Sequence, residues 1–246
     1  CALKILFTPN PEDQYEPMIP AAPAFSSSRA SSFDLSPVLL NRLRQASVDA
    51  VRSFFIFSKK IENYQENRDY FYLDASSNLS VHLRFGLVSA RTLFNKIKRL
   101  NAPKKQIDFF IRELFWREFY NYILYHFPKS QFENLNSIKV NWNQNEDDFK
   151  NWCEGNTGVP IIDASMRYLN QTGLMHNRLR MVTSSYLTKN LLIDWRKGEE
   201  YFALKLLDYE QASNVGNWQW AAGSGVDAAP YFRIFNPYLQ TKKFDP

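Results

Sequence analysis

The apolar residues of this chain recur at helical spacing from Ser36 and Pro37 onward, and no segment alternates between apolar and polar residues as a strand would. Ser36 followed by Pro37 indicates a helix start, because proline fits the first helical position. The pattern restricts the fold to the all-α class. We expect helices at residues 37–62, 90–100, 104–126, 146–153, 160–172, 176–188, 196–206 and 209–222.

A helical chain of this length can enclose an internal ligand. Its 246 residues are enough for one large domain, and 16% of them are aromatic. Residues 1–35 are rich in proline and serine, which predicts a linker or a disordered arm, so the domain should cover residues 36–246. Because the first residue is Cys1 and not methionine, we expect a fragment.

Composition excludes several kinds of site. Only Cys1 and Cys153 are present and the three histidines are not at ligand spacing, so we expect no disulfide framework and no metal site. No glycine-rich motif follows a strand, which excludes a Rossmann nucleotide site. No apolar run is long enough to span a membrane and no signal peptide is present, so we expect a soluble cytoplasmic protein. The net charge of +5 weakly favours a polyanionic partner.

The segment Asp208–Pro230, DYEQASNVGNWQWAAGSGVDAAP, sets two tryptophans two residues apart in a predicted helix. Positions two apart on a helix point to nearly opposite sides, so Trp218 can face inward while Trp220 faces a cleft. Asn214 precedes Trp218 by four residues and shares its face. Spacing alone is equally compatible with a core helix that packs two indoles.

This segment closely resembles the flavin-binding core of the DNA photolyase/cryptochrome family, and in particular the class I cyclobutane pyrimidine dimer photolyases. The resemblance continues through five further blocks in the family's order: YQENRDY, SSNLSVHLRFG, ELFWREFYNYILYHFP, GNTGVPIIDASMRYLNQTGLMHNRLRM and LTKNLLIDWRKGEEYF. It covers the chain from about Tyr64 to its end. It implies the multi-helical FAD-binding domain of the family, without the N-terminal α/β antenna domain and truncated at the C-terminus. The antenna pigment is therefore not assigned.

The resemblance implies FAD as the cofactor, in the reduced form FADH⁻ for function. Serine hydroxyls and backbone N–H groups would hold the diphosphate in place of a glycine-rich loop. A charged pair, Arg180 and Asp208, would lie at the isoalloxazine ring, and Asn214 would face N5. Glu210 stands where many relatives have aspartate, so the carboxylate is kept on a side chain that is one methylene longer. The implied FAD contacts are Tyr64, Ser76, Ser77, Asn78, Leu79, Ser80, Arg180, Asp208, Glu210 and Asn214.

The resemblance also implies a chain of tryptophans, Trp218, Trp195 and Trp152, that carries an electron from the surface to the flavin. We expect Trp152 to be the surface end, because it lies near the end of a short polar helix. Each of the three alone would be read as a packing residue.

The lesion pocket implied by the resemblance is formed by Glu113, Trp116, Asn177, Met181 and Trp220. Spacing supports it, since Glu113 and Trp116 are three apart and Asn177 and Met181 four apart, so each pair shares a helix face. Photolyases are among the enzymes that act on a base flipped out of the stack. Basic or polar residues expected to contact flanking phosphates are Arg68, Arg117, Arg178, Gln240 and Lys242.

The resemblance implies a light-dependent lyase of the photolyase family, a monomer that repairs cyclobutane pyrimidine dimers in DNA inside a bacterial cell. One alternative is a cryptochrome-type blue-light photoreceptor without repair activity. Asn214 argues against it, because plant cryptochromes carry aspartate there and many animal ones carry cysteine. A second alternative is a helical nucleic-acid-binding module without a cofactor, which the absorbance of the purified protein would distinguish.

Overall fold

Helices form the regular structure of the residues that the computed structural model describes, which are 37–136, 140–226, 228 and 232–245, and no strand occurs among them. The all-α prediction is confirmed. The chain divides into two units, Cys1–Asn41 and Arg42–Pro246, and the second contains every predicted site residue. Residues 1–35, predicted to be a linker or a disordered arm, lie outside the described residues.

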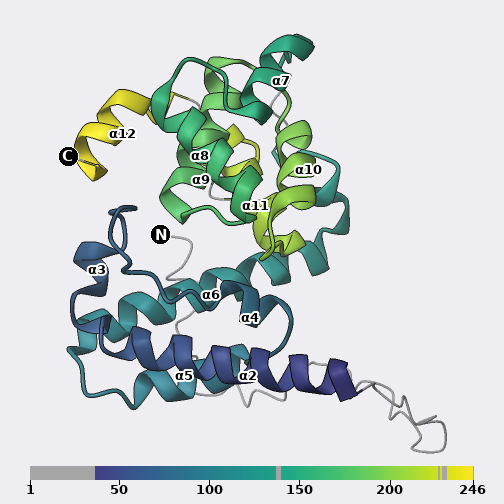
Figure 1. The fold of residues 1–246 in the computed structure, drawn as a ribbon. Coiled ribbons are helices and arrows are strands. Elements are labelled where there is room, and N and C mark those ends of the chain that lie inside the picture. The colour runs from purple at the N-terminus through teal and green to yellow at the C-terminus, as the bar shows by residue number, and fades with distance from the viewer. Residues whose placement is uncertain (1–36, 137–139, 227, 229–231, 246) are drawn as a thin grey trace, which may run out of the picture. The chain divides into compact units, whose positions relative to one another are not determined.

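The helices follow the chain in the order drawn in Figure 1. They are α2 (Pro37–Ser58), α3 (Tyr64–Asn67), α4 (Ser80–Arg84), α5 (Ala90–Lys98), α6 (Lys104–His126), α7 (Glu146–Glu154), α8 (Pro160–Thr172), α9 (Asn177–Ser185), α10 (Trp195–Lys205), α11 (Gln211–Ala222) and α12 (Pro237–Phe244). Short 3₁₀ turns occupy Ile61–Asn63 and Pro128–Gln131, and a π-helical turn, Tyr186–Asn190, continues α9. No helix of the described residues is long and apolar enough to cross a membrane.

Local signals in the sequence set the ends of several helices. The side chains of Asn145, Asp194 and Glu210 accept hydrogen bonds from backbone N–H groups in the first turns of α7, α10 and α11. Gly155 ends α7 in the left-handed region at φ 71°, where a Cβ would also lie 2.7 Å from the Asp163 carbonyl oxygen. These caps explain why the predicted bounds of the longer helices are close to the observed ones.

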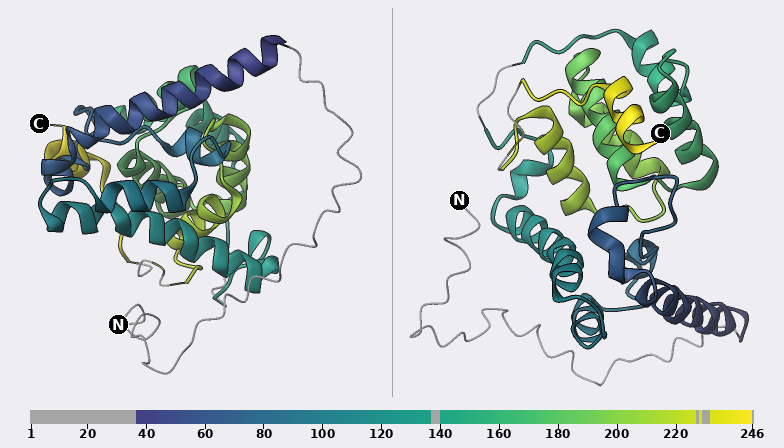
Figure 2. Two further views of the ribbon diagram at one scale, coloured as in Figure 1. Left: turned by 90° about the horizontal axis from the view of Figure 1, so that it is seen from below. Right: turned by 90° about the vertical axis from the view of Figure 1, so that its left-hand side faces the viewer.

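Two apolar clusters hold the second unit together. One is formed mainly by α7 to α11 and contains the indoles of Trp152, Trp195 and Trp218, each of which is at most 2% exposed. The other lies between α2, α5 and α6 and includes Phe57, Leu93 and Phe110. Figures 1 and 2 show the same two groups of helices.

Close packing joins the two groups of helices. A Cβ on Gly216 of α11 would lie 2.1 Å from the ring of Tyr120, so only glycine allows α11 to approach α6 this closely. A second junction is the turn after α3. There the carbonyl oxygen of Arg68 lies 3.0 Å from Nε2 of His176, the N-cap of α9. Of the helices joined here, α9 and α11 line the cavity described next.

Candidate functional site: a cavity between α9 and α11

A cavity of about 180 Å³, partly open to solvent, lies between α9, the end of α10 and α11. Aromatic and apolar side chains form part of the wall, and polar groups converge from both helices. The lining residues include Asn177, Arg180, Met181, Asp208, Glu210, Asn214, Trp218 and Trp220. The structure thus gathers eight predicted site residues, from Asn177 to Trp220, around one space.

Arg180 and Asp208 form a charged pair in the wall of this cavity. Nη2 of Arg180 donates to both carboxylate oxygens of Asp208, at 2.9 and 2.8 Å, while its Nε donates to the Met175 carbonyl at 2.9 Å. The Asp208 side chain is only 6% exposed and that of Arg180 is 28% exposed. The two side chains are therefore held in fixed positions, as a site for a polar ring edge requires.

Asn214 is oriented by Glu199, a residue that the sequence did not single out. Nδ2 of Asn214 donates to the carbonyl oxygen of Glu199 at 3.3 Å and to its Oε1 at 3.1 Å. The hydroxyl of Tyr209 donates to the same Oε1 at 3.1 Å, and burial raises the pKa of Tyr209, so the phenol stays protonated. Because Glu199 engages the amide nitrogen, the carbonyl oxygen of Asn214 remains for a ligand.

Glu210 lines the cavity but also has a structural task. Its Oε2 accepts from the backbone N–H and the hydroxyl of Ser213, at 3.0 and 2.6 Å, and so caps α11. The predicted contact of Glu210 with the cofactor would therefore share this carboxylate with the cap.

The three tryptophans of the predicted relay all lie in the apolar cluster behind the cavity. The rings of Trp218 and Trp152 are 6.1 Å apart, and Phe202 lies 5.0 Å from Trp218 and 6.0 Å from Trp152. The prediction that Trp152 is the surface end is wrong, because its side chain is 0% exposed and its Nε1 donates to the Thr183 carbonyl. The helix carrying it is polar only on its outer face.

Trp142 is the indole that the sequence reasoning missed. It is partly exposed and packs against the same cluster. The next residue, Asn143, donates its backbone N–H to the carbonyl oxygen of Leu192 at 2.7 Å. Leu192 precedes Trp195 by three residues, so this hydrogen bond holds the Trp142 segment against the chain just before α10. The signal available in the sequence was a tryptophan in a polar segment with no helical pattern, VNWNQN.

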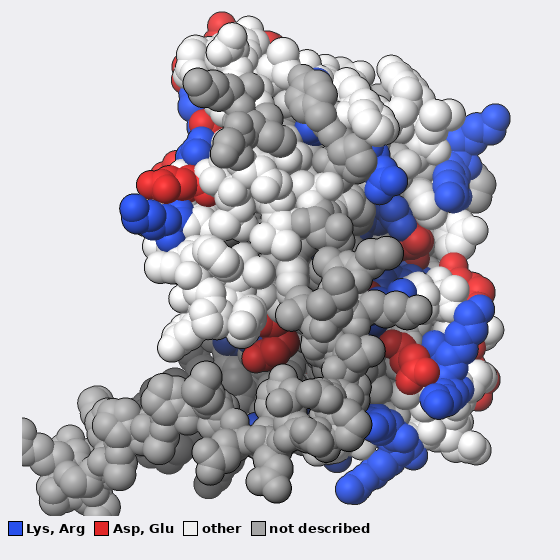
Figure 3. Space-filling model, turned by 180° about the vertical axis from the view of Figure 1, so that it is seen from behind, with Lys and Arg blue, Asp and Glu red and all other residues white. Residues whose placement is uncertain are grey.

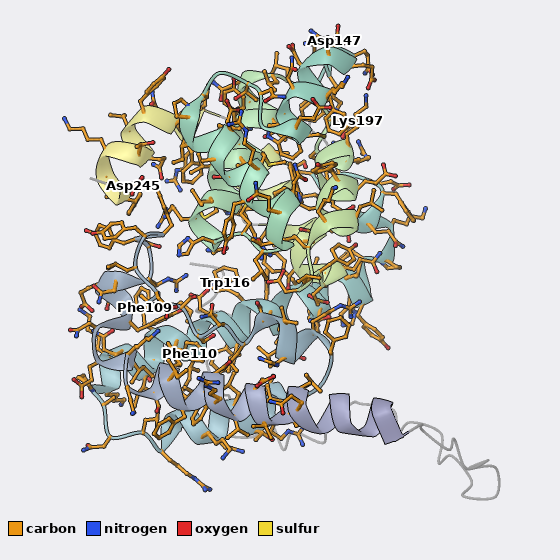
Figure 4. The ribbon with its side chains drawn as sticks, viewed as in Figure 1. Phe109, Phe110, Trp116, Asp147, Lys197 and Asp245 are labelled. Carbon is orange, nitrogen blue, oxygen red and sulfur yellow. The ribbon has the colours of Figure 1, made fainter. Side chains whose placement is uncertain are left out.

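The predicted lesion residues divide into two groups. Asn177, Met181 and Trp220 line the cavity, with Asn177 exposed and Trp220 half-buried beside Phe235 at a ring distance of 6.1 Å. Glu113 and Trp116 lie on α6 and are not among its lining residues; Trp116 stacks on Tyr120 at 6.1 Å. Figure 4 labels Trp116 on α6 together with Phe109 and Phe110.

The predicted diphosphate segment also lies away from the cavity lining. Asn78 has φ 54° and its side chain bonds to Asp74 and Ser76, while the hydroxyl of Ser77 accepts from the Leu79 N–H. Ser80 begins α4, and Leu79 is buried in the second cluster. Tyr64 is buried there too, and burial raises its pKa to about 12.

Of the predicted phosphate contacts, two arginines are engaged in ion pairs. Arg68 pairs with Glu113, and Arg178 pairs with Asp69 and stacks over the Phe244 ring at 4.4 Å. Arg117 is half-buried on α6, Gln240 lies on α12 with a buried Oε1 that has no partner, and Lys242 is exposed. Among the described residues no cluster could hold a metal ion.

The donor set of the cavity fits a flavin ring. The indole of Trp218 and the side chains of Phe202 and Leu206 give an apolar wall for a flat ring, and Arg180, Asp208 and Asn214 offer donors and acceptors to its polar edge. Residues 110–246 match the family model described as the FAD-binding domain of DNA photolyase, which is more than half of the chain. The chain belongs to this family. Its cofactor is FAD.

Known relatives agree with this membership. A curated protein named deoxyribodipyrimidine photo-lyase from Alkalihalophilus pseudofirmus is 45% identical over 199 residues, which is 80% of this chain and 42% of that protein. A crystal structure of a bacterial class III photolyase from Agrobacterium tumefaciens has a TM-score of 0.78 at 45% identity, over 81% of this chain and 42% of that one. A Synechocystis cryptochrome structure has a TM-score of 0.76 at 36% identity, over 82% and 43%. The chain spans less than half the length of these relatives.

Proposed function

We propose that this chain is the FAD-binding catalytic part of an enzyme that uses light to repair cyclobutane pyrimidine dimers in DNA. One observation carries the proposal: the residues expected at the flavin ring (Arg180, Asp208, Asn214) and residues expected at the lesion (Asn177, Trp220) line a single cavity. A cofactor and a flipped pyrimidine dimer held there would be close enough for direct electron exchange. The relatives from Alkalihalophilus pseudofirmus and Agrobacterium tumefaciens are named as photolyases, which supports the same activity.

Arg180, Asp208 and Asn214 would hold the ring of FAD, with the Asn214 carbonyl oxygen as an acceptor beside it. When bound in its reduced form FADH⁻, the cofactor would supply the light-excited electron that opens the cyclobutane ring and would take it back afterwards. The protein groups around it therefore need to exclude water and keep the two partners in place. The Trp218, Phe202 and Leu206 wall supports that task.

Asn177, Met181 and Trp220 would receive the flipped dimer at the open side of the cavity. An indole stacked on a base contributes about 1–3 kcal/mol. Glu113 and Trp116 would complete the pocket from α6, and Arg68, Arg117, Arg178, Gln240 and Lys242 would contact the flanking backbone. Diphosphate contacts of Tyr64 and Ser76–Ser80, class I membership, the monomeric state and the location in the bacterial cell interior stay predictions.

The test of repair is a blue-light assay on DNA that contains thymine dimers, using the full-length protein and its Trp220→Ala variant. We expect the parent to restore thymines and to prefer damaged over undamaged duplex, and Trp220→Ala to lose about five- to hundredfold in affinity for the damaged duplex only. Tyr168→Ala, which removes an exposed ring from α8, is the matched control. A flavin-containing parent that repairs nothing in light would favour the photoreceptor alternative, which the likeness to the Synechocystis cryptochrome supports.

Electron supply gives a second prediction. An indole that is to be reduced from solution must be accessible, which favours Trp142 over Trp152 as the outer end of the relay. We expect Trp218→Phe and Trp142→Phe to slow the photoreduction of bound oxidised FAD strongly, and Trp152→Phe to slow it less. Transient absorption measures the rates. Equal slowing by Trp152→Phe and none by Trp142→Phe would restore Trp152 as the outer end.

A further inference from the structure

Basic side chains gather at the corner where α5 ends and α6 begins. Residues 90–105 contain six of the chain's 30 lysines and arginines and no acid, so the other residues contribute 24 basic and 25 acidic side chains. This corner accounts for the whole positive charge of the protein. The six are Arg91, Lys96, Lys98, Arg99, Lys104 and Lys105, and all are exposed. Figure 1 draws this corner at the lower left, and the half-turn of Figure 3 brings that side to the lower right, where blue side chains gather.

A row of residues connects the corner to the lesion site along α6. Lys105, Phe109, Arg112 and Trp116 follow one another at intervals of four, three and four, so they share one stripe of the helix. The guanidinium of Arg112 lies 4.4 Å from the centre of the Phe109 ring, and that of Arg68 lies 5.7 Å from it. Phe109 therefore lies between Arg68, which pairs with Glu113 of the predicted lesion pocket, and Arg112 of the row toward the corner.

The side chains of this row are accessible to a partner. Lys105 and Arg112 are exposed, and no carboxylate forms an ion pair with either in the described part of the chain. The pKa of Glu66 is lowered mainly by the hydrogen bond from Gln106 and to a lesser extent by Lys105. Asp108 and Glu113 also stand beside the row in the sequence, and Glu113 pairs with Arg68. The corner and Arg112 together have seven basic side chains, which outnumber these three carboxylates.

We propose that Lys105, Arg112 and the α5–α6 corner form a track for the phosphates of duplex DNA that flanks the lesion. The inference rests on the proposed function, since Trp116 defines where the track starts. From Trp116 to Lys105 the helix rises by about 16 Å. At about 3.4 Å per base pair, this distance equals about five base pairs of duplex. Duplex DNA fits better than an anionic membrane because the row starts at a residue of the base pocket.

The track makes a prediction that depends on DNA length. A double variant, Lys105→Gln with Arg112→Gln, removes two phosphate contacts, so the slope of log affinity against log salt should fall by about 1.8. Between 50 and 200 mM salt the parent's affinity should then drop about twelvefold more than the variant's. This difference should be seen with duplexes that extend eight base pairs beyond the lesion, and should vanish with flanks of two base pairs.

Matched controls make the result specific. Lys150→Gln with Lys205→Gln removes two exposed charges from α7 and α10 and should leave the salt slope unchanged. Arg112→Lys keeps the charge and should keep the slope. The proposed track is wrong if the double variant affects short and long duplexes equally, or if its salt slope equals that of the parent. It is also wrong if the variant loses binding to anionic vesicles and not to DNA. If repair fails in light while the length-dependent salt effect holds, only the proposed function is wrong.

Discussion

At the residue scale, the partly buried ion pair of Arg180 and Asp208 decides how the cavity is organised. Both carboxylate oxygens of Asp208 accept from one guanidinium nitrogen, so neither side chain can turn without losing its partner. Ion pairs of this kind contribute little relative to an apolar pair, but removal of one member leaves an uncompensated charge in a poorly solvated place. The pair therefore fixes geometry more than it adds stability.

Replacement of Asp208 tests this view. Asp208→Asn should lower the free energy of unfolding by about 3 kcal/mol, because Arg180 keeps its charge and loses its carboxylate. Urea unfolding of the protein without added FAD measures the change. Asp245→Asn removes an exposed carboxylate beyond α12 and should change it by less than about 0.5 kcal/mol. Equal effects of the two substitutions would show that the pair has no special role.

At the element scale, α9 is positioned by the residue just before it. Nδ1 of His176 accepts from the Arg178 N–H at 3.1 Å, which leaves the hydrogen on Nε2 to be donated to the Arg68 carbonyl at 3.0 Å. One neutral imidazole thus caps α9 and ties it to the turn after α3. The charged groups around it are Arg68, Asp69 and Arg178, and burial lowers its pKa.

The sign of the pH effect follows from that lowered pKa. As pH falls below about 6.5, the unfolded chain binds a proton at His176 that the folded protein does not, so stability decreases until the folded pKa is reached. His176→Asn keeps a capping oxygen but removes the titration. Chemical unfolding at pH values from 7 to 5 should give a flatter decline for this variant than for the parent. Parallel declines would mean that the pKa of His176 is the same in the folded and the unfolded protein.

At the scale of the whole molecule, the cavity is completed only by elements from the second half of the chain. Residues 177–221 contribute its entire lining, although they share a cluster with α7 and α8. A ligand that binds this folded arrangement and not the unfolded chain must stabilise all of it together. Because FAD binding stabilises the whole folded arrangement, its effect on the unfolding free energy reports on global unfolding.

Added FAD should therefore raise the melting temperature in proportion to the logarithm of its concentration. At a hundred times the dissociation constant, the stabilisation is about 2.7 kcal/mol, equivalent to roughly 5 to 10 °C for a domain of this size. Differential scanning fluorimetry measures the shift, and Asp208→Asn should reduce it. Riboflavin, which lacks the diphosphate, is the comparison for contacts beyond the ring. If the protein is folded but its melting temperature does not change with added FAD, the assignment of the cavity as the FAD site is wrong.

The sequence by itself determined the helical class and the positions of the longer helices. Helices predicted at 104–126 and 160–172 are observed at those bounds, because caps and apolar periodicity are local properties of the chain. The short helices α3, α4 and α12 were not predicted, since fewer than three turns give little periodic signal and their stability comes from contacts with distant residues. The resemblance of the sequence to the photolyase/cryptochrome family also identified eight of the residues that line the cavity.

Only the tertiary structure decided which tryptophan is buried and what orients Asn214. Trp152 lies on a polar helix, yet α8, α9 and α10 cover it completely, and burial of this kind depends on packing between segments. Glu199 bonds to Asn214 across fifteen residues of chain, and no spacing rule relates a residue of α10 to one of α11. Side-chain partners between helices follow from how the helices cross, which local sequence patterns do not encode.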